Sequence, residues 1–194
     1  SIIGKTTAGV TYTGIENLKD GKKHLLISNH RDIILDPAII QVLLYENKVH
    51  TTEIAVGDNL ISSQFIEDIT RSNGMIKVVR GGTPREIYSS SCHLSEYLRS
   101  KIAAGECSAW IAQRNGRTKD GKDETSQGLV KMLQMSGSGD FAADFEELNI
   151  VPIAISYQYE PCDFLKAREL YISRRQQYVK QPGEDLQSML TGLT

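Results

Sequence analysis

The sequence predicts an α/β fold in which a mostly parallel, mixed sheet carries helices on both faces. Two observations support this prediction. Short apolar runs alternate along the chain with longer amphipathic stretches, as in proteins built from βαβ units. The length of 194 residues, with 40% hydrophobic and 24% charged residues, is typical of one globular domain with a sizeable core. We therefore expect a single domain over residues 1–194, with loops at the strand ends available for chemistry.

The expected elements follow the order of these runs. The predicted strands cover residues 9–14, 25–28, 53–56, 76–79, 109–112 and 150–156. The predicted helices cover residues 37–46, 63–72, 84–103, 125–134 and 164–177, and residues 136–140 form a flexible connector. The helix at 84–103 opens on a capping box, because Thr83 suits the cap, Pro84 the first helical position and Glu86 the position three residues after the cap.

Composition argues against several kinds of partner and site. A net charge of -2 gives no reason to expect a nucleic acid as partner. The cysteines are three in number and far apart, which argues against a disulfide framework and a zinc site and fits a reducing cytoplasm: Cys92, Cys107 and Cys162. Three of the histidines lack metal-like spacing, so we expect no metal: His24, His50 and His93.

No apolar run reaches the roughly 18 residues that a membrane span requires. The best run, residues 150–155, has the length of a strand. If the substrate is a lipid, the protein must therefore visit the surface of the bilayer. The chain begins at Ser1 without a methionine and stops at Thr194 just after a possible helix, so we expect it to be a part of something longer.

The most informative segment places a histidine at a strand end and an acid at a helix start. The strand is residues 24–28, and His30 falls in the turn that follows it. Asp36 suits the helix cap and Pro37 the first helical position. An imidazole held by a carboxylate can take a proton from a hydroxyl, and Asp32 is a rival for the carboxylate role. The alternative is structural, with a hydrogen-bonded turn histidine and a simple helix cap.

A second candidate site follows the strand at residues 76–79. Arg80, Gly81 and Gly82 lead into the capped helix, where glycines allow close backbone approach and the helix start offers free N–H groups. An anion could bind there, with Arg85 as a weaker contributor. The alternative is a plain connection with a solvated arginine.

A third candidate site is a glycine turn between two arginines, after the strand at residues 109–112. Arg114 and Arg117 flank Gly116, and together they could hold a phosphate. The alternative is a polar turn that continues into residues 118–122, which we expect to be solvated.

The first segment resembles the signature of the glycerolipid acyltransferase superfamily, the PlsC-like enzymes. In that signature an asparagine-histidine pair is followed by four variable residues and an aspartate. Here Asn29 and His30 are separated from Asp36 by five residues, 31–35, which we interpret as a bulge ahead of the helix. Residues 36–40 are similar to the continuation seen in soluble plastid glycerol-3-phosphate acyltransferases.

The later segments resemble further motifs of that family, in the family's order. Arg80 with the glycine after it is similar to the second motif, and Gly116 with Arg117 is similar to the third. Asn115 stands where the family usually has an acid, which puts any charge role at that position in doubt. Pro152, in an apolar strand, resembles the last motif and would shape the pocket.

The resemblance implies transfer of a fatty acyl group from acyl-CoA or acyl-ACP to a hydroxyl of glycerol 3-phosphate or lysophosphatidate. These thioesters would be co-substrates, with no further cofactor. His30 would be the base and Asp36 its orienting acid, and the phosphate would be held by the arginines of the second and third candidate sites. Asn29 and Gly82 mark backbone N–H groups that could stabilise the oxyanion.

The resemblance also implies a location in the cytoplasm, peripherally on the inner face of the membrane. Two other functions remain open. One is an acyltransferase for a different lipid acceptor, such as an amino-acid lipid. The other is a non-catalytic lipid- or anion-binding module, in which the wider spacing from His30 to Asp36 has broken the pair. A ring nitrogen of His30 within hydrogen-bond reach of Asp36 or Asp32 would favour catalysis.

Overall fold

The computed structural model describes residues 7–61, 64–179, 181, 183–184, 187–188 and 191. Its strands are β1 (Leu25–Ser28), β2 (Glu53–Gly57), β3 (Met75–Val78), β4 (Ala109–Ala112) and β5 (Ile150–Ile153). Its α-helices are α2 (Leu35–Glu46), α3 (Gln64–Ser72), α4 (Pro84–Ala103), α5 (Gln127–Gln134), α6 (Phe141–Glu146) and α7 (Asp163–Ser173). Short 3-10 helices are η1 (Ile15–Leu18) and η2 (Asp58–Leu60).

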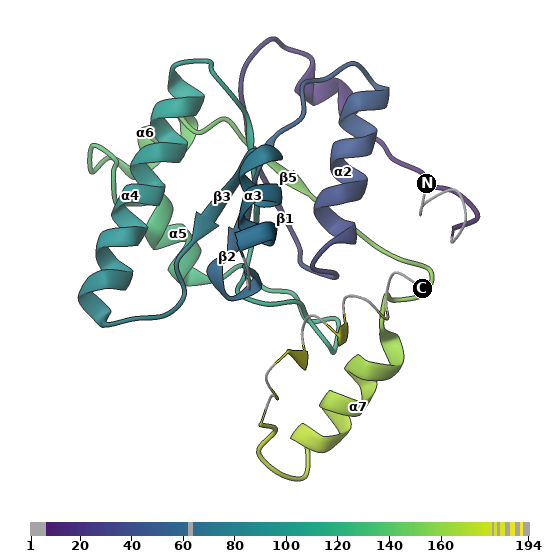
Figure 1. The fold of residues 1–194 in the computed structure, drawn as a ribbon. Coiled ribbons are helices and arrows are strands. Elements are labelled where there is room, and N and C mark those ends of the chain that lie inside the picture. Colours follow the sequence, from purple (N-terminus) through teal and green to yellow (C-terminus); the bar gives the residue numbers. More distant parts are fainter. Residues whose placement is uncertain are drawn as a thin grey trace.

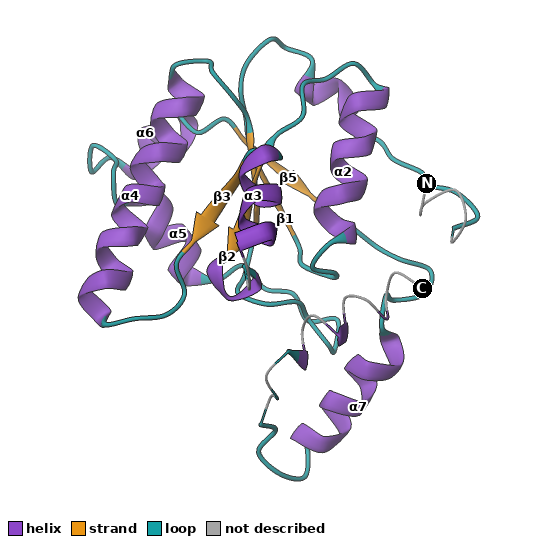
Figure 2. Cartoon of the chain, viewed as in Figure 1, coloured by secondary structure: helices purple, strands orange, loops and turns teal. Residues whose placement is uncertain are grey.

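The five strands form one sheet in the order β3-β2-β4-β1-β5. Figure 2 shows the strands, in orange, between the helices. Each pairing is parallel, with Leu25 of β1 opposite Ala109 of β4 and opposite Ile150 of β5. The predicted α/β class is therefore confirmed, and the described sheet is wholly parallel rather than mixed. Because all strands point the same way, their carboxyl ends meet at one edge, where the loops after β1, β3 and β4 carry the candidate residues.

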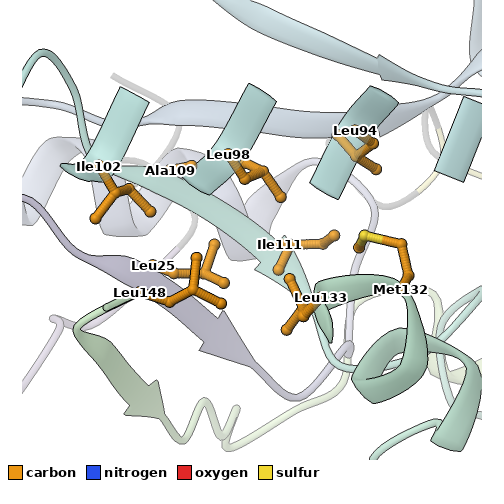
Figure 3. Close-up of a cluster of buried hydrophobic side chains, with 9 residues drawn as sticks. All are labelled: Leu25, Leu94, Leu98, Ile102, Ala109, Ile111, Met132, Leu133 and Leu148. Carbon is orange, nitrogen blue, oxygen red and sulfur yellow. The ribbon is translucent and has the colours of Figure 1, made fainter. Parts of the chain in front are cut away.

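One side of the sheet is covered by α4, α5 and α6 (Figure 1). The helix α4 presents Leu94, Leu98 and Ile102 at a spacing of about one helical turn, so that all three lie on one face. They pack with Leu25 and Ile111 of the strands, and Figure 3 shows these side chains in a single layer with the rest of the cluster: Ala109, Met132, Leu133 and Leu148.

The other side of the sheet is covered by α2. Ile40 and Leu44, four residues apart on that helix, pack on Leu26 and Trp110. Neighbouring strand residues such as Leu25 and Leu26 therefore enter opposite cores, as the alternation of side chains along a strand requires. The two cores fix β1 at the middle of the layered structure, and with it the position of the turn that carries His30.

Most predicted elements lie within a few residues of the observed ones, with three exceptions. The expected strand at residues 9–14 is irregular, and residues 9–13 are exposed and pair with none of the described strands. The helix α6 was not expected, although Asp140 caps it through bonds from the N–H groups of Ala142 and Ala143. The last predicted helix, 164–177, is the shorter α7, which ends at Ser173. Residue 63, the first of another predicted helix, lies outside the described residues.

A buried arginine ties α4 to the ends of α5 and α6. Arg99 is only 8% exposed, and its Nη2 donates to the carbonyl oxygen of Leu133 at 2.8 Å. Its Nη1 donates to the carbonyl oxygen of Asp144 at 2.8 Å and to Glu147 at 2.7 Å. Carbonyl groups near helix ends lack partners within the helix, and this guanidinium supplies them.

We expect Arg99→Ala to lower the free energy of unfolding by about 3 kcal/mol, because it leaves buried acceptors without donors. Urea unfolding followed by circular dichroism measures the change. The matched control is Arg71→Ala, since that arginine is 75% exposed in its pair with Glu67 and such pairs contribute about 0.5 kcal/mol. Equal losses in the two variants would contradict the structural role of Arg99.

Candidate functional site

The structure brings His30 and Asp36 together at the carboxyl end of β1. The Nδ1 atom of His30 lies 3.2 Å from Oδ2 of Asp36, and the two side chains are 9% and 0% exposed. Because Asp36 can only accept when its carboxyl group has lost its proton, this contact puts the imidazole proton on Nδ1. The Nε2 atom is then the nitrogen with a free lone pair. The wider spacing in the sequence has therefore not separated the two side chains.

The carboxylate of Asp36 is held by three further donors. Its Oδ2 accepts the backbone N–H groups of Arg31 at 2.7 Å and Asp32 at 2.8 Å. Its Oδ1 accepts the hydroxyl of Tyr157 at 2.8 Å. Burial, and then the charge of Asp36, raise the pKa of Tyr157 far above its ordinary value, so this hydroxyl keeps its proton and remains a donor. A fully buried carboxylate needs such donors to replace water.

The rival acid, Asp32, has a different role. Its Oδ1 accepts the N–H groups of Ile34 at 3.0 Å and Leu35 at 2.9 Å, and no bond joins it to His30 among the described residues. The expectation that Asp36 caps the helix and that the helix begins at Pro37 was wrong, because α2 begins at Leu35. Asp32 supplies acceptors to the first N–H groups, which leaves Asp36 in the first turn with its carboxylate turned back toward His30.

The backbone of His30 is fixed on both sides. Its N–H donates to Oδ2 of Asp123 at 2.6 Å, and its carbonyl accepts from the N–H of Thr118 at 2.9 Å. The N–H of His30 is thus already paired. Thr118 is only 1% exposed, so the expectation that residues 118–122 are all solvated was wrong. The loop after β4 folds over the loop after β1 because these strands are neighbours.

Asn29 joins the same region to the segment after β5. Its side-chain amide donates to the carbonyl of Ile155 at 2.8 Å and accepts from the N–H of Ile155 at 2.7 Å. These two bonds continue the pairing of β1 with β5 beyond the strand ends, and Tyr157 follows two residues later. The amide of Asn29 thereby helps to position the tyrosine that contacts Asp36.

Among the described residues, Arg117 is the predicted phosphate-binding arginine that contacts the turn after β1, through Asp32. Its side chain is 7% exposed, and its Nη1 lies 3.7 Å from Oδ2 of Asp32. Among the described residues this Nη1 makes no hydrogen bond, while Nη2 donates to Ser188. Gly116, with a φ of 69°, forms the left-handed turn before it, a conformation that favours glycine. Arg117 also lines a cavity of about 560 Å³ that it shares with α7.

The other two arginines do not join this group. Arg114 directs Nη1 to the carbonyl of Lys122 at 3.1 Å. Arg80 is exposed, and it follows β3, which is separated from β1 by β2 and β4; three strand spacings are about 14 Å. Its guanidinium lies over Gly57, where an added Cβ would come within 2.6 Å of Nε. The three arginines are therefore spread along the edge of the sheet.

The helix start after Arg80 is occupied by a side chain of the protein itself. The predicted capping box is present, with Oε2 of Glu86 accepting the N–H of Thr83 at 2.7 Å and its hydroxyl at 2.8 Å. These bonds from Thr83 lower the pKa of Glu86. We expected the N-terminus of α4 to bind an anion, and the carboxylate of Glu86 already lies there. Gly81 has open space where a Cβ would be, and Gly82 faces Glu86.

Pro152 lies in β5, an edge strand, opposite Ile27, and it is exposed. An edge is where a sheet tolerates proline. Pro152 therefore lies in the outermost strand of the sheet, directly beside β1.

Three residues of the site were not expected from the sequence, because each is far from His30 along the chain: Tyr157, Asp123 and Lys166. Lys166 of α7 is 3% exposed and donates from Nζ to the carbonyl of Arg31 at 2.6 Å and to Glu160 at 2.6 Å. The guanidinium of Arg31 binds the same Glu160. This hydrogen bond and these ion pairs attach α7 to the turn that holds His30.

Two absences concern the described residues only. They contain no group of three or more histidine, cysteine or acidic side chains placed to hold a metal ion. None of their helices combines the length and the apolar character needed to cross a membrane.

Comparison with known proteins gives one match. A protein family described as Acyltransferase matches residues 9–156, which include the whole sheet, the His30–Asp36 pair and Arg117. The match spans well over half of the 194 residues. Tyr157 and α7 lie beyond the matched residues. No curated protein sequence matches the chain.

We expect Tyr157→Phe to weaken the dependence of stability on alkaline pH. In the unfolded chain this hydroxyl ionises near pH 10, whereas burial raises the pKa of Tyr157 in the folded protein. Above pH 10 the unfolded state therefore binds fewer protons, and the free energy of unfolding falls by up to about 1.4 kcal/mol per pH unit from this residue. Tyr157→Phe should therefore not show this fall in the free energy of unfolding above pH 10. At neutral pH it should be less stable than the wild type by about 2 kcal/mol, because Asp36 loses a donor.

Urea unfolding at neutral pH and at several values above pH 10 measures both effects of Tyr157→Phe. The matched control is Tyr45→Phe, since Tyr45 is 77% exposed, and it should follow the wild type throughout. If Tyr157→Phe and the wild type lose stability in parallel above pH 10, the buried contact between Tyr157 and Asp36 is contradicted.

Proposed function

Because the chain belongs to the glycerolipid acyltransferase superfamily, we propose that it transfers a fatty acyl group from acyl-CoA or acyl-ACP to a hydroxyl of glycerol 3-phosphate or lysophosphatidate. The observation that carries this proposal is the contact of 3.2 Å between His30 Nδ1 and Asp36 Oδ2. It supports catalysis over the non-catalytic binding module, which requires a broken pair. The reaction forms an ester bond, breaks the thioester and releases a thiol.

In the proposed mechanism the Nε2 atom of His30 takes the proton of the acceptor hydroxyl. Asp36 orients the ring through Nδ1 and stabilises the imidazolium that forms. The hydroxyl oxygen attacks the thioester carbonyl directly, and the imidazolium then returns its proton to the leaving thiolate. The donors around Asp36, among them Tyr157, keep its carboxylate in place during this cycle. No covalent acyl-enzyme is needed.

Arg117 would hold the phosphate of the acceptor. Its buried Nη1, with no hydrogen bond among the described residues, could donate to a phosphate oxygen, and its loop is bonded to the carbonyl of His30 through Thr118. Fixing the phosphate near His30 converts binding energy into orientation of the hydroxyl. Arg114 and Arg80 point elsewhere, so we assign this role to Arg117 first. The likeness of Arg80 to the family's second motif remains without a role here.

Substrates must reach a histidine that is nearly closed off, because only 9% of its side chain is exposed. The described cavity at Arg117 does not include His30 in its lining. We propose that α7, which reaches the turn through the contacts of Lys166 and Glu160, moves to admit the acceptor. The cavity between Arg117 and α7 would then be continuous with the ring.

We expect His30→Ala to reduce acyl transfer by about a thousandfold, the usual contribution of a general base, while the protein stays folded. The assay follows labelled acyl-CoA with purified protein and a panel of acceptors: glycerol 3-phosphate, lysophosphatidate and a lyso-amino-acid lipid. His93→Ala is the matched control, since that histidine is exposed on α4. Unchanged turnover in His30→Ala would contradict the role of His30 as the base. Transfer to the amino-acid lipid alone would show that this lipid is the acceptor, in place of glycerol 3-phosphate or lysophosphatidate.

We expect Arg117→Lys to raise the KM for glycerol 3-phosphate about 10- to 100-fold, because a charge-assisted hydrogen bond contributes roughly 1.5–3 kcal/mol. Lysine keeps the charge opposite Asp32, so the fold should survive, and the melting temperature checks this. Kinetics with a phosphate-free acceptor, such as a monoacylglycerol, should change little. Equal losses for both acceptors would remove the phosphate role from Arg117, and Arg71→Lys is the control for an exposed arginine.

A further inference from the structure

The helix α7 has two faces of different character. Residues of a helix turn by about 100° each, so Leu165, Glu169 and Ile172 share one face with the buried Lys166. All of these are buried or half-buried. A second, neighbouring face carries Phe164, Arg168, Tyr171 and, just after the helix end, Arg175, and all four are exposed. We call this set the aromatic–arginine face.

The aromatic side chains of this face are open to solvent to an unusual degree. Phe164 is 75% exposed and Tyr171 is 60% exposed, and Tyr159, shortly before the helix, is 80% exposed. The guanidinium of Arg175 lies over the ring of Tyr171, 3.8 Å from its centre. Large apolar groups gathered beside cations in this way mark a surface that contacts something else.

The charge of this face is positive, although the whole chain carries a net charge of -2. Arg168 and Arg175 form no ion pair with any described residue. The acid nearest the middle of the helix, Glu169, lies on the other face, where Lys119 pairs with it at 3.0 Å. The exposed face therefore presents two guanidinium groups beside its two aromatic rings, neither in an ion pair among the described residues.

The same helix reaches the candidate site. Lys166, on its buried face, donates to the carbonyl of Arg31, whose N–H donates to Asp36. Arg168 and Arg117 line the same cavity. The aromatic–arginine face therefore belongs to the same helix that contacts the turn of His30. In Figure 1, α7 projects from the lower end of the molecule and does not pack on the sheet.

We propose that the aromatic–arginine face docks on an anionic lipid bilayer and holds the cavity of Arg117 against the membrane surface. This inference rests on the proposed function, since a lysolipid acceptor or acylated product resides in a bilayer. Aromatic rings insert at the level of the headgroups, and arginines are attracted by anionic lipids. A face of one helix of 11 residues covers roughly 200 Å², far below the about 800 Å² per partner of a stable protein interface. A membrane therefore fits this face better than a second protein.

The test is sedimentation of the full chain with two kinds of vesicle, phosphatidylcholine alone and phosphatidylcholine mixed with phosphatidylglycerol. Wild-type protein should bind the anionic vesicles only, and less so at high salt. In Arg168→Gln/Arg175→Gln the binding constant should fall about fivefold for each arginine. In Phe164→Ala/Tyr171→Ala it should fall at least as far, because the inserted rings are lost.

Matched controls carry the same changes elsewhere on the surface. Tyr45→Ala/Tyr88→Ala removes rings that are 77% and 62% exposed, and Arg71→Gln/Arg85→Gln removes two exposed arginines. Both should bind vesicles like the wild type. Equal losses in controls and test variants, or no binding to anionic vesicles, would overturn the inference. So would a dimer in sedimentation velocity that Phe164→Ala/Tyr171→Ala dissociates, because the face would then bind a second copy.

The outcomes also separate this inference from the proposed function. Transfer of a short acyl chain from its coenzyme A thioester to glycerol 3-phosphate, without vesicles, should be unchanged in Phe164→Ala/Tyr171→Ala. Vesicle binding without any acyl transfer by the wild type would leave the docking surface and remove the enzyme. Acyl transfer without vesicle binding would support the enzyme and contradict the docking surface.

Discussion

The site depends on one carboxylate that has been taken out of water. Asp36 is 0% exposed, and burying such a group is costly unless donors replace its hydration. The N–H groups of Arg31 and Asp32, the ring of His30 and the hydroxyl of Tyr157 supply them. To bring these donors together, the turn after β1 must curl around the carboxylate and β5 must extend alongside it. The position of the imidazole is therefore a consequence of satisfying Asp36.

Much of the fold follows from local patterns, whereas the strand order does not. The apolar run at residues 25–28 and the capping box at Thr83 and Glu86 are signals that a few neighbouring residues carry, and the structure contains both elements. The order β3-β2-β4-β1-β5 is set by which strands pair across the chain. That order separates Arg80 from Arg117, so a sequence that places both after strands cannot show whether they share a site.

The contacts around His30 also divide into those that a local sequence pattern predicts and those that depend on the fold. The His30–Asp36 contact could be predicted because both residues belong to one short segment. That Asp32 rather than Asp36 accepts the first N–H groups of α2 could not be predicted, since the sequence offers both acids near the helix start. Tyr157 is 121 residues away from Asp36, with no periodicity or spacing to link them. Among the missed elements, α6 did have a local signal in Asp140, its cap.

Arg31 connects the buried pair to the outside of the molecule. Its N–H binds Asp36, its carbonyl accepts from Lys166, and its guanidinium binds Glu160, which also binds Lys166. Any displacement of α7 must act on this residue first, because the helix reaches the turn through these contacts. Since the family match ends at residue 156, the pair lies in the matched part of the chain, and the helix that supports it lies in the part beyond. A bilayer that binds the outer face of α7 would therefore act on the same segment that holds Asp36 against His30.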